Sequence, residues 1–400
     1  MQFSDIIGQT TTRQHLTELV AHNRLSHALL FTGKEGNGAL ALAIAFAQYL
    51  VCEKTSNLNV QQGPSLFGYP EPQISNAELQ TDSCGQCPSC QKVQQLIHPD
   101  IHFSYPTVTI KSGDKPIATD FISEWRDFIK TNPYGNLFDW IELIKEKENS
   151  QGKITAEECN DIIRKLSLKS FENKYKVLIM WMPEMMGTEG NKLLKLIEEP
   201  PADTLFILVT ENEPQVLPTI VSRCQLIQIP ALKTTEIEQA LIARNNTDVQ
   251  TARQVASVSE GNYREALQLV QHAEEDWQAL LREWLNAILK TGPIAQTRWV
   301  EDISRLGREK QKQFLRYFNH LLEQAIRLNA TGSTPVHGTE KDFAERLNKI
   351  AGIEQQQAII EELDKATYYI ERNANAKMLF HALTIKLYHI IQDKVVFLTE

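Results

Sequence analysis

A glycine-rich turn that follows the first apolar run has the spacing of a phosphate-binding loop but lacks its charged residues. A functional loop of this kind reads Gly-x4-Gly-Lys-Ser/Thr, in which the Lys reaches the β- and γ-phosphates and the hydroxyl binds Mg²⁺. Gly33, Gly36 and Gly38 keep the turn, whereas Ala39 and Leu40 stand where the Lys and the hydroxyl are needed. The backbone amides of the turn could still hold an anion weakly, but we expect no productive binding of Mg-nucleotide.

A second position for nucleotide chemistry also lacks its acidic residues. Sheets that hydrolyse nucleotides end a buried strand in carboxylates that hold Mg²⁺. After the apolar run at residues 177–180 this chain has Trp181 and Met182, and no carboxylate occurs before Glu184. Because the required residues are missing at both expected positions, the sequence indicates a nucleotide-binding fold that no longer hydrolyses nucleotides. A sheet that never bound a nucleotide predicts the same inactivity.

Three closely spaced thiols are the strongest positive sign of a site. Cys84, Cys87 and Cys90 are separated by two residues each, and thiolate clusters of this kind favour Zn²⁺ with four ligands over buried or redox-active thiols. We expect Cys52 to be the fourth ligand, with His98 as the alternative. Because protein atoms would fill all four positions, the predicted zinc is structural rather than catalytic.

A single arginine, Arg223, lies between Ser222 and Cys224 after a predicted short helix. An arginine in that place most often bonds the carbonyls at the end of the helix. The alternative is an arginine finger, whose planar guanidinium stabilises phosphate charge on a neighbouring subunit. The spacing alone favours the helix-end interpretation.

The elements that must position these residues change character along the chain. Apolar strands alternate with helices up to residue 230, which predicts an α/β domain with a parallel sheet covered on both faces. A polar insertion interrupts it at residues 55–81, and an enlarged segment at 120–153 is predicted to be helical over 120–144. After Pro230 only helices are expected, first a small three-helix unit at 231–275 and then long amphipathic helices at 276–400.

The composition narrows the class of protein. The net charge of −9, from 41 Lys+Arg and 50 Asp+Glu, argues against a chain that coats nucleic acid by bulk charge. Six cysteines in 400 residues do not form a disulfide framework. No signal peptide or membrane span is recognised, so we expect a cytoplasmic protein.

Several motifs are shared with one family. They lie at residues 3–9, 26–33, 84–90 with 98–100, 191–195 with 198–201, 217–224 and 261–267. Together they resemble the AAA+ clamp-loader subunits of bacterial DNA polymerase III, most closely the delta-prime group. The resemblance covers residues 1 to about 270 well and the remainder only by its helical pattern.

The resemblance implies a fold and a role for individual residues. It implies an AAA+ nucleotide-fold domain at 1–230 with a zinc module at 52–100, a helical lid at 231–275 and a helical collar, an oligomerisation domain, at 276–400. Thr210 and Arg264 match the two sensor positions of the family, and Arg223 matches its arginine finger. The implied role is that of a non-hydrolysing subunit in a hetero-oligomeric ring with gamma/tau-like motor and delta-like subunits. That ring loads the sliding clamp on primed DNA at the expense of ATP during DNA replication.

Two alternatives remain open from the sequence. A gamma/tau-like motor ATPase shares the zinc module and the Ser-Arg-Cys motif, but it must keep the Lys and the acidic pair that Ala39 and Trp181 replace here. A zinc-bearing DNA-binding or adaptor protein outside replication is disfavoured by the acidic charge and by the lack of a helix with clustered Arg and Lys.

Overall fold

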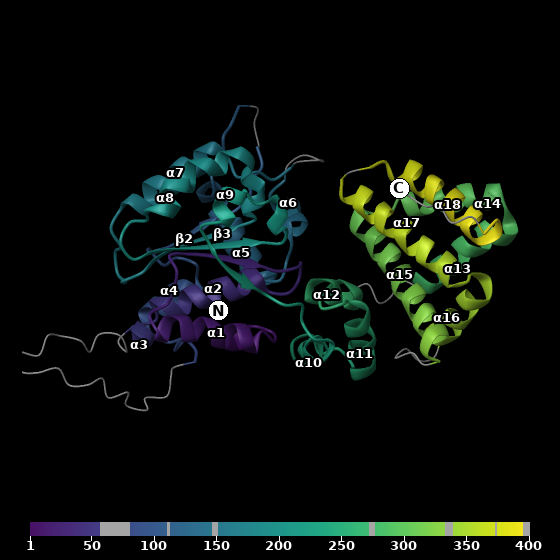
Figure 1. Cartoon of the computed structure of the whole chain (residues 1–400), viewed down its shortest axis with the longest axis horizontal. Coiled ribbons are helices and arrows are strands. Elements are labelled where there is room, and N and C mark those ends of the chain that lie inside the picture. The colour runs from purple at the N-terminus through teal and green to yellow at the C-terminus, as the bar shows by residue number, and fades with distance from the viewer. Residues whose placement is uncertain are drawn as a thin grey trace, which may run out of the picture. The chain divides into compact units, whose positions relative to one another are not determined.

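The computed structural model describes residues 1–56, 81–109, 113–145, 151–271, 277–332, 339–372 and 374–394. Within them the chain forms two compact units, Met1–Val270 and Gln271–Glu400 (Figure 1). Nearly all of the predicted insertion at 55–81 lies outside the described residues. The finer division into three domains stays a prediction, because the helices expected to form the lid belong to the same unit as the sheet.

The first unit is built on a sheet of five parallel strands, which confirms the predicted α/β class. The strands are β1(Ala28–Thr32), β2(Ile101–Ser104), β3(Lys176–Trp181), β4(Thr204–Thr210) and β5(Gln225–Gln228), in the spatial order β2-β3-β4-β1-β5. Thr32 pairs with Thr210, and Trp181 pairs with Val209. The carboxyl ends of the three central strands therefore meet at one edge, where parallel sheets commonly bind ligands.

Alternate residues of each strand enter two separate cores, as expected for a sheet covered on both faces. Leu29, Phe31, Ile179 and Ile207 face the core that α2, α5 and α6 complete. Leu30, Met180 and Leu208 face the core formed with α7, η4 and α9. Figure 1 shows α7 and α9 on one side of the sheet and α2 on the other.

The helices of this unit follow the predicted order. They are η1(Phe3–Asp5), α1(Thr10–Ala21), α2(Ala39–Val51), α3(Glu53–Ser56), α4(Pro88–Gln94), η3(Ala118–Phe121), α5(Ile122–Thr131), α6(Leu137–Ile144), α7(Ala156–Ser167), η4(Pro183–Leu193), α8(Leu194–Glu198), η5(Glu213–Gln215) and α9(Pro218–Val221). Every residue of α2 is buried, which explains why small alanines fill the helix that follows the glycine turn.

The helix predicted at 120–144 is in fact interrupted. The chain leaves α5 at Asn132 and begins α6 after Asn136, because Pro133 cannot continue the hydrogen-bonded turn and Gly135 favours a bend. The Asn136 side chain then caps α6 by accepting from the Asp139 amide at 3.0 Å. The interruption brings Tyr134 to the carboxyl edge of the sheet.

The starts of two further helices are defined by local contacts. Thr155 caps α7, accepting from the amide of Glu158 at 3.2 Å. The Glu158 carboxylate does not complete a capping box, because it accepts instead from the Ala118 amide at 2.6 Å. The chain after Pro183 is 3₁₀ as far as Leu193 and α-helical from Leu194.

Three short helices close the first unit. They are α10(Thr234–Asn245), α11(Val249–Val258) and α12(Tyr263–Gln271), as predicted. Their small core contains Ile237, Leu241 and Tyr263, and it is completed by Ile7 and Tyr134 from the sheet-bearing part of the unit. We call these three helices, with residues 231–271, the lid.

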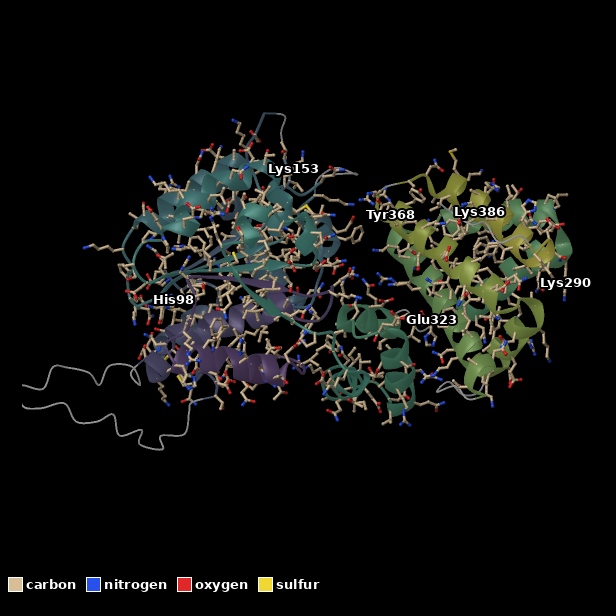
Figure 2. The ribbon with its side chains drawn as sticks, viewed as in Figure 1. His98, Lys153, Lys290, Glu323, Tyr368 and Lys386 are labelled. Carbon is tan, nitrogen blue, oxygen red and sulfur yellow. The ribbon has the colours of Figure 1, made fainter. Side chains whose placement is uncertain are left out.

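The second unit is entirely helical among the residues described. Its elements are α13(Trp277–Asn286), the π-helix η6(Ala287–Thr291), α14(Pro293–Ser304), α15(Arg308–Thr331), α16(Thr339–Ile350), α17(Ile353–Glu371) and α18(Ala376–Gln392). The Trp284 ring stacks on Trp299 with centroids 4.5 Å apart, and its Nε1 donates to Thr384 at 3.0 Å. Lys386 and Tyr368, which Figure 2 labels, belong to this unit. No described helix in either unit has the length and hydrophobicity needed to cross a membrane.

Candidate functional site

The Asn37 side chain occupies an amide at the end of the glycine turn between β1 and α2. Gly36 and Gly38 have φ of 72° and 85°, values that favour glycine. The Asn37 side chain donates to the Ile229 carbonyl at 2.9 Å and accepts from the Ala39 amide at 3.1 Å. Because Asn37 occupies this amide at the start of α2, the turn is less able to hold an anion than its glycines predict.

The space over the turn is small. The cavity lined by the turn, Pro133–Gly135, Trp181 and the end of β4 measures about 20 Å³, whereas small-molecule sites usually measure about 300–1,000 Å³. Tyr134 closes it, since a Cβ on Gly38 would lie 2.6 Å from the Tyr134 ring. The Tyr134 hydroxyl accepts from the Ile7 amide at 2.8 Å. Its ring meets the edge of Tyr263 with centroids 5.1 Å apart.

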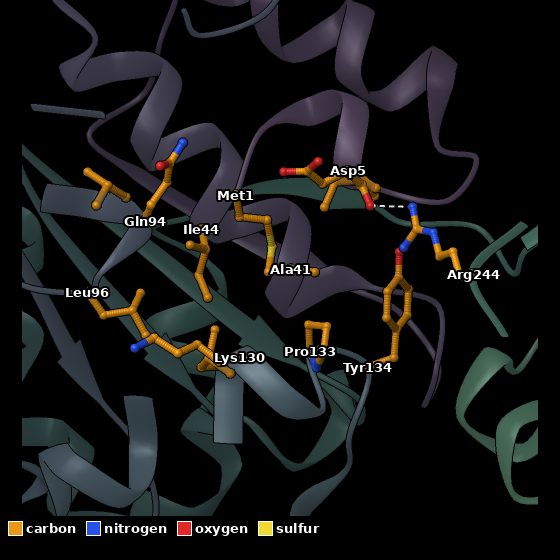
Figure 3. Close-up of a pocket in the computed structure, with 13 residues that line it drawn as sticks. Met1, Asp5, Ala41, Ile44, Gln94, Leu96, Lys130, Pro133, Tyr134 and Arg244 are labelled. Carbon is orange, nitrogen blue, oxygen red and sulfur yellow. Dashed lines mark hydrogen bonds between the residues drawn. The ribbon is translucent and has the colours of Figure 1, made fainter. Parts of the chain in front are cut away.

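Pro133 and Tyr134, which line this closed space, also line an apolar pocket of about 270 Å³ (Figure 3). Ala41 and Ile44 of α2 line it together with Ile6. At its rim the lid residue Arg244 donates to the Asp5 carbonyl at 2.6 Å. The glycine turn does not line this pocket. The pocket and the space over the turn therefore do not form one continuous cavity for a base and its phosphates.

Trp181 fills the position where an acidic pair was expected. Its ring is buried and packs on Trp125 and Phe128 with centroids 5.5 and 5.8 Å apart. Those two residues belong to α5, in the enlarged segment 120–153. The aromatic cluster of that segment therefore reaches the carboxyl edge of the sheet, where Trp181 packs at the position expected for a carboxylate.

Glu184 lies next to the end of β4, a position that the sequence did not reveal. A left-handed residue, Met182 with φ of 57°, and the 3₁₀ turns of η4 redirect the chain. The Glu184 carboxylate then accepts from the hydroxyl of Thr210, the predicted sensor residue, at 2.8 Å. Burial raises the pKa of Glu184.

The open mouth of the site is acidic. A surface pocket of about 320 Å³ is lined by Glu35, Glu184 and Glu211 around a single Lys34. Because Glu35 is paired with Arg264, the pocket offers the phosphates of a nucleotide only Lys34, beside the carboxylates of Glu184 and Glu211.

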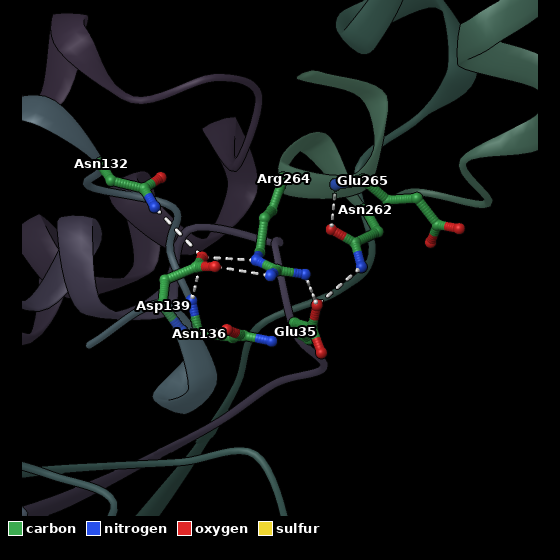
Figure 4. Close-up of polar contacts among 7 residues, drawn as sticks. All are labelled: Glu35, Asn132, Asn136, Asp139, Asn262, Arg264 and Glu265. Carbon is green, nitrogen blue, oxygen red and sulfur yellow. Dashed lines mark hydrogen bonds and ion pairs between the residues drawn. The ribbon is translucent and has the colours of Figure 1, made fainter. Parts of the chain in front are cut away.

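Arg264, the second predicted sensor residue, is already neutralised within the chain. Its side chain is 3% exposed. The Nε and one terminal nitrogen donate to the two Asp139 oxygens at 2.5 and 2.6 Å, and the other terminal nitrogen donates to Glu35 at 2.9 Å (Figure 4). Nothing in the sequence indicates this role for Asp139, which lies 125 positions away from Arg264.

The four cysteines converge as predicted. The Sγ atoms of Cys52, Cys84, Cys87 and Cys90 all lie within 4.8 Å of one another, and those of Cys84 and Cys90 are 3.9 Å apart. Tetrahedral zinc with Zn–S bonds of about 2.3 Å requires sulfur atoms about 3.8 Å apart. Hydrogen bonds from the Cys90 thiol and from backbone amides lower the pKa of Cys52 to about 4, so the cluster favours a thiolate. The donor set therefore fits a divalent metal of the zinc type.

His98, the alternative ligand, is used elsewhere. Its Nδ1 accepts from the Asp100 amide at 3.1 Å, and its Nε2 lies 3.0 Å from the Asn173 side-chain amide (Figure 2). The Asp100 carboxylate accepts from backbone amides of residues 171–173. The His98-Pro99-Asp100 motif therefore fixes the loop before β3. The remaining cysteines, Cys159 and Cys224, lie outside the cluster, and burial raises the pKa of each to about 11.

Arg223 lies just beyond α9, with its side chain 33% exposed. One terminal nitrogen donates to the Thr219 carbonyl at 2.6 Å, which is the contact expected of a helix-end arginine. Its Nε donates to Glu198 of α8 at 2.6 Å. The guanidinium is therefore at the surface and is held by Thr219, Ser222 and Glu198.

These features define a P-loop-type α/β protein whose nucleotide site is closed by its own side chains and which carries a cysteine cluster. A family model described as "DNA polymerase III, delta subunit" matches residues 8–65 and 71–233. The chain belongs to this family.

Individual relatives agree with that assignment. The chain is 27% identical over 256 residues to the delta' subunit of DNA polymerase III from Bacillus subtilis, covering 64% of this chain and 57% of the relative. It is 26% identical over 306 residues to the Escherichia coli delta' subunit, covering 75% and 70%. It is also 26% identical over 278 residues to the tau/gamma subunit from Haemophilus influenzae, covering 68% and 30%. The chain thus spans about half or less of the length of the Bacillus and Haemophilus proteins.

Proposed function

We propose that this chain is a non-hydrolysing, delta-prime-like subunit of the DNA polymerase III clamp loader and works in the cytoplasm. The observation that carries the proposal is the closed nucleotide site of a family member, with about 20 Å³ over the glycine turn. In this proposal the subunit joins gamma/tau-like motor and delta-like subunits in a ring. It reaches the sliding clamp and primer-template DNA through that ring.

Within this proposal Arg223 is an arginine finger that acts on the nucleotide of a neighbouring subunit. Its partial exposure supports the role, since the guanidinium can meet a partner without unfolding α9. Glu198 holds it in the isolated chain, and a γ-phosphate with its greater charge can compete for the same fork. The surface ion pair that must be exchanged contributes little to stability.

Zinc in the proposed subunit is structural. The four thiolates would hold it at the junction between the end of α2 and the start of α4, with no open position for substrate. Held there, it ties the residues at 81–94 to the helix that follows the glycine turn.

A gamma/tau-like motor is the second candidate, and the closed site speaks against it. A motor needs Mg-ATP in this space, where Tyr134, Trp181 and the neutralised Arg264 lie instead. Among the helices that the structure describes, none with clustered Arg and Lys supports a separate DNA-binding adaptor.

The test is reconstitution of the ring with the candidate motor and delta-like subunits, followed by an ATPase assay with clamp and primed DNA. Arg223→Ala should slow hydrolysis at the one site that this subunit serves by about 10³-fold, so that total activity falls partially. Arg223→Lys should be nearly as damaging, because an ammonium cannot copy the planar fork. Arg253→Ala, which removes an exposed arginine of α11, is the matched control.

Two results would overturn the proposal at different levels. Wild-type ATPase and clamp loading in the Arg223→Ala ring would leave Arg223 a helix-end residue and remove the trans-acting role. Failure of the wild-type chain to co-purify with the motor subunit would remove the clamp-loader assignment itself.

A further inference from the structure

The segment at residues 132–139, here called the plug segment, lies between the glycine turn and the lid. It supplies Tyr134 and Asp139, whose side chains contact both parts. Tyr134 meets Ile7 and the turn on one side and Tyr263 of the lid on the other. Asp139 binds Arg264 of the same lid helix. One short segment thus joins two structures that a bound nucleotide would otherwise join.

The charge in this region requires an anion. A guanidinium that is 3% exposed is costly to bury unless a negative group is paired with it. Asp139 meets it with two parallel hydrogen bonds, the fork geometry that carboxylate and phosphate share. Glu35 comes from the glycine turn itself and occupies the remaining terminal nitrogen. The two carboxylates together supply the negative charge that phosphates would bring.

The space in this region requires a flat aromatic group. Tyr134 is 4% exposed. Its ring lies in contact distance of Gly38 and edge-on to Tyr263, and its hydroxyl hydrogen bonds to a backbone amide at residue 7. An aromatic group that is packed against the turn and hydrogen-bonded to the backbone therefore occupies the space over the turn.

From these contacts we propose that the plug segment is an internal ligand of the degenerate nucleotide site. Tyr134 supplies the volume, and Asp139 with Glu35 supplies the negative charge that Arg264 requires. The lid is consequently held against the sheet-bearing part of the unit without any nucleotide. The inference concerns the isolated chain and holds whether or not the chain works in a clamp loader.

Other contacts fasten the lid without involving charge on Arg264. Arg244 donates to the Asp5 carbonyl (Figure 3), Gln9 donates to the Pro230 carbonyl at 2.7 Å, and the Tyr263 amide donates to the Gly36 carbonyl at 3.1 Å. Loss of the Asp139–Arg264 pair should therefore loosen α12 while the unit stays folded. This makes a local measurement more informative than a global one.

The experiment is amide hydrogen exchange on the full chain, with β4 as the internal reference. Asp139→Ala and Arg264→Gln should each raise exchange in α12 by at least about tenfold, because opening of the lid becomes easier. The double variant should be no faster than the faster single variant, since both changes break the same pair. Asp127→Ala removes an exposed carboxylate of α5 and is the matched control, with wild-type exchange.

Inorganic phosphate separates an internal ligand from an ordinary ion pair. Added phosphate should restore slow exchange of α12 in Asp139→Ala, where Arg264 is again available to an anion, and should have no effect in the wild type or in Arg264→Gln. Wild-type exchange in Asp139→Ala would overturn the proposal. Faster exchange that phosphate leaves unchanged would overturn it too, because Asp139 would then only be capping α6.

Discussion

Cys52 is remote in sequence from the other three thiols, yet its Sγ accepts from the Cys84 amide at 3.3 Å. We predict one zinc per chain. Cys52→Ser and Cys84→Ser should each lose it, because three thiolates and a hydroxyl hold Zn²⁺ much more weakly than four thiolates. Metal analysis of the purified variants measures this. Cys159→Ser, which changes a buried thiol outside the cluster, should keep a full equivalent.

The result that would contradict this prediction most clearly concerns His98, the alternative ligand. His98→Ala should also keep its zinc, because both nitrogens of His98 already have partners around Asp100 and Asn173. Zinc that survives in Cys52→Ser but is lost in His98→Ala would assign the fourth position to His98.

Ala39 and Leu40 are not the whole reason why a nucleotide should fail to bind. We predict that neither the wild type nor a chain carrying Ala39→Lys and Leu40→Thr binds Mg-ATP more tightly than roughly millimolar. Restoring the two motif residues leaves Tyr134 in the space and Asp139 on Arg264. Equilibrium binding of labelled nucleotide tests this, with thermal unfolding as the check on folding. A micromolar, Mg-dependent complex of either chain would contradict it.

At the scale of elements, α15 contains a buried histidine that should make the second unit sensitive to acid. His320 is 3% exposed, its Nε2 has no hydrogen-bond partner among the described residues, and burial lowers its pKa from 6.5 to about 4. Above pH 6.5 both the folded and the unfolded chain are neutral here. Between pH 6.5 and 4 only the unfolded chain takes up the proton, so stability falls as the pH falls.

Between these pH values the titration of His320 lowers the free energy of unfolding by on the order of 3 kcal/mol. His320→Leu should remove it and should cost little at pH 7, because an apolar side chain replaces an unpaired nitrogen. Hydrogen exchange of α15 in the full chain at pH 7 and pH 5 measures the effect. An equal acid response in His320→Leu would assign the sensitivity to other groups.

The elements themselves could be predicted from local pattern, whereas their long-range partners could not. The alternation of strands and helices, the buried helix after the glycine turn and the three lid helices are all encoded within short windows. Pro133 and Gly135 also indicate a break, but the apolar periodicity on either side of them predicts one continuous helix. Asp139 and Glu184 are different, since nothing local indicates that they meet Arg264 and Thr210.

The same difference between local patterns and long-range contacts applies to the cysteine cluster and the glycine turn. Three thiols at fixed spacing predict a metal site by themselves, and Cys52 required only the assumption that the cluster needs a fourth ligand. The replaced residues at 39, 40, 181 and 182 predict a loss of chemistry. They do not reveal that Tyr134 and Trp181 fill the space, because that depends on how α5 and α6 pack against the sheet.

At the scale of the whole molecule, the lid and the sheet-bearing part should be stable only together. We predict that a fragment of residues 1–275 folds and keeps its zinc, whereas a fragment of residues 1–230 unfolds at lower temperature. The shorter fragment exposes Ile7 and Tyr134 and leaves Asp139 without Arg264. Thermal unfolding followed by circular dichroism compares the two. Equal melting temperatures would show that the lid adds nothing to the stability of the remainder.

The six tryptophans are divided equally between the two units, with Trp125, Trp140 and Trp181 in the first and Trp277, Trp284 and Trp299 in the second. Trp284 and Trp299 lie nearly parallel, at 3° and 4.5 Å, so their ultraviolet transitions should couple and give a paired circular-dichroism band. Trp181 borders the closed cavity, and its emission should respond if that cavity opens. The chain therefore carries separate optical reporters for each unit, and Trp→Phe changes confined to one unit would let each be followed in the intact protein.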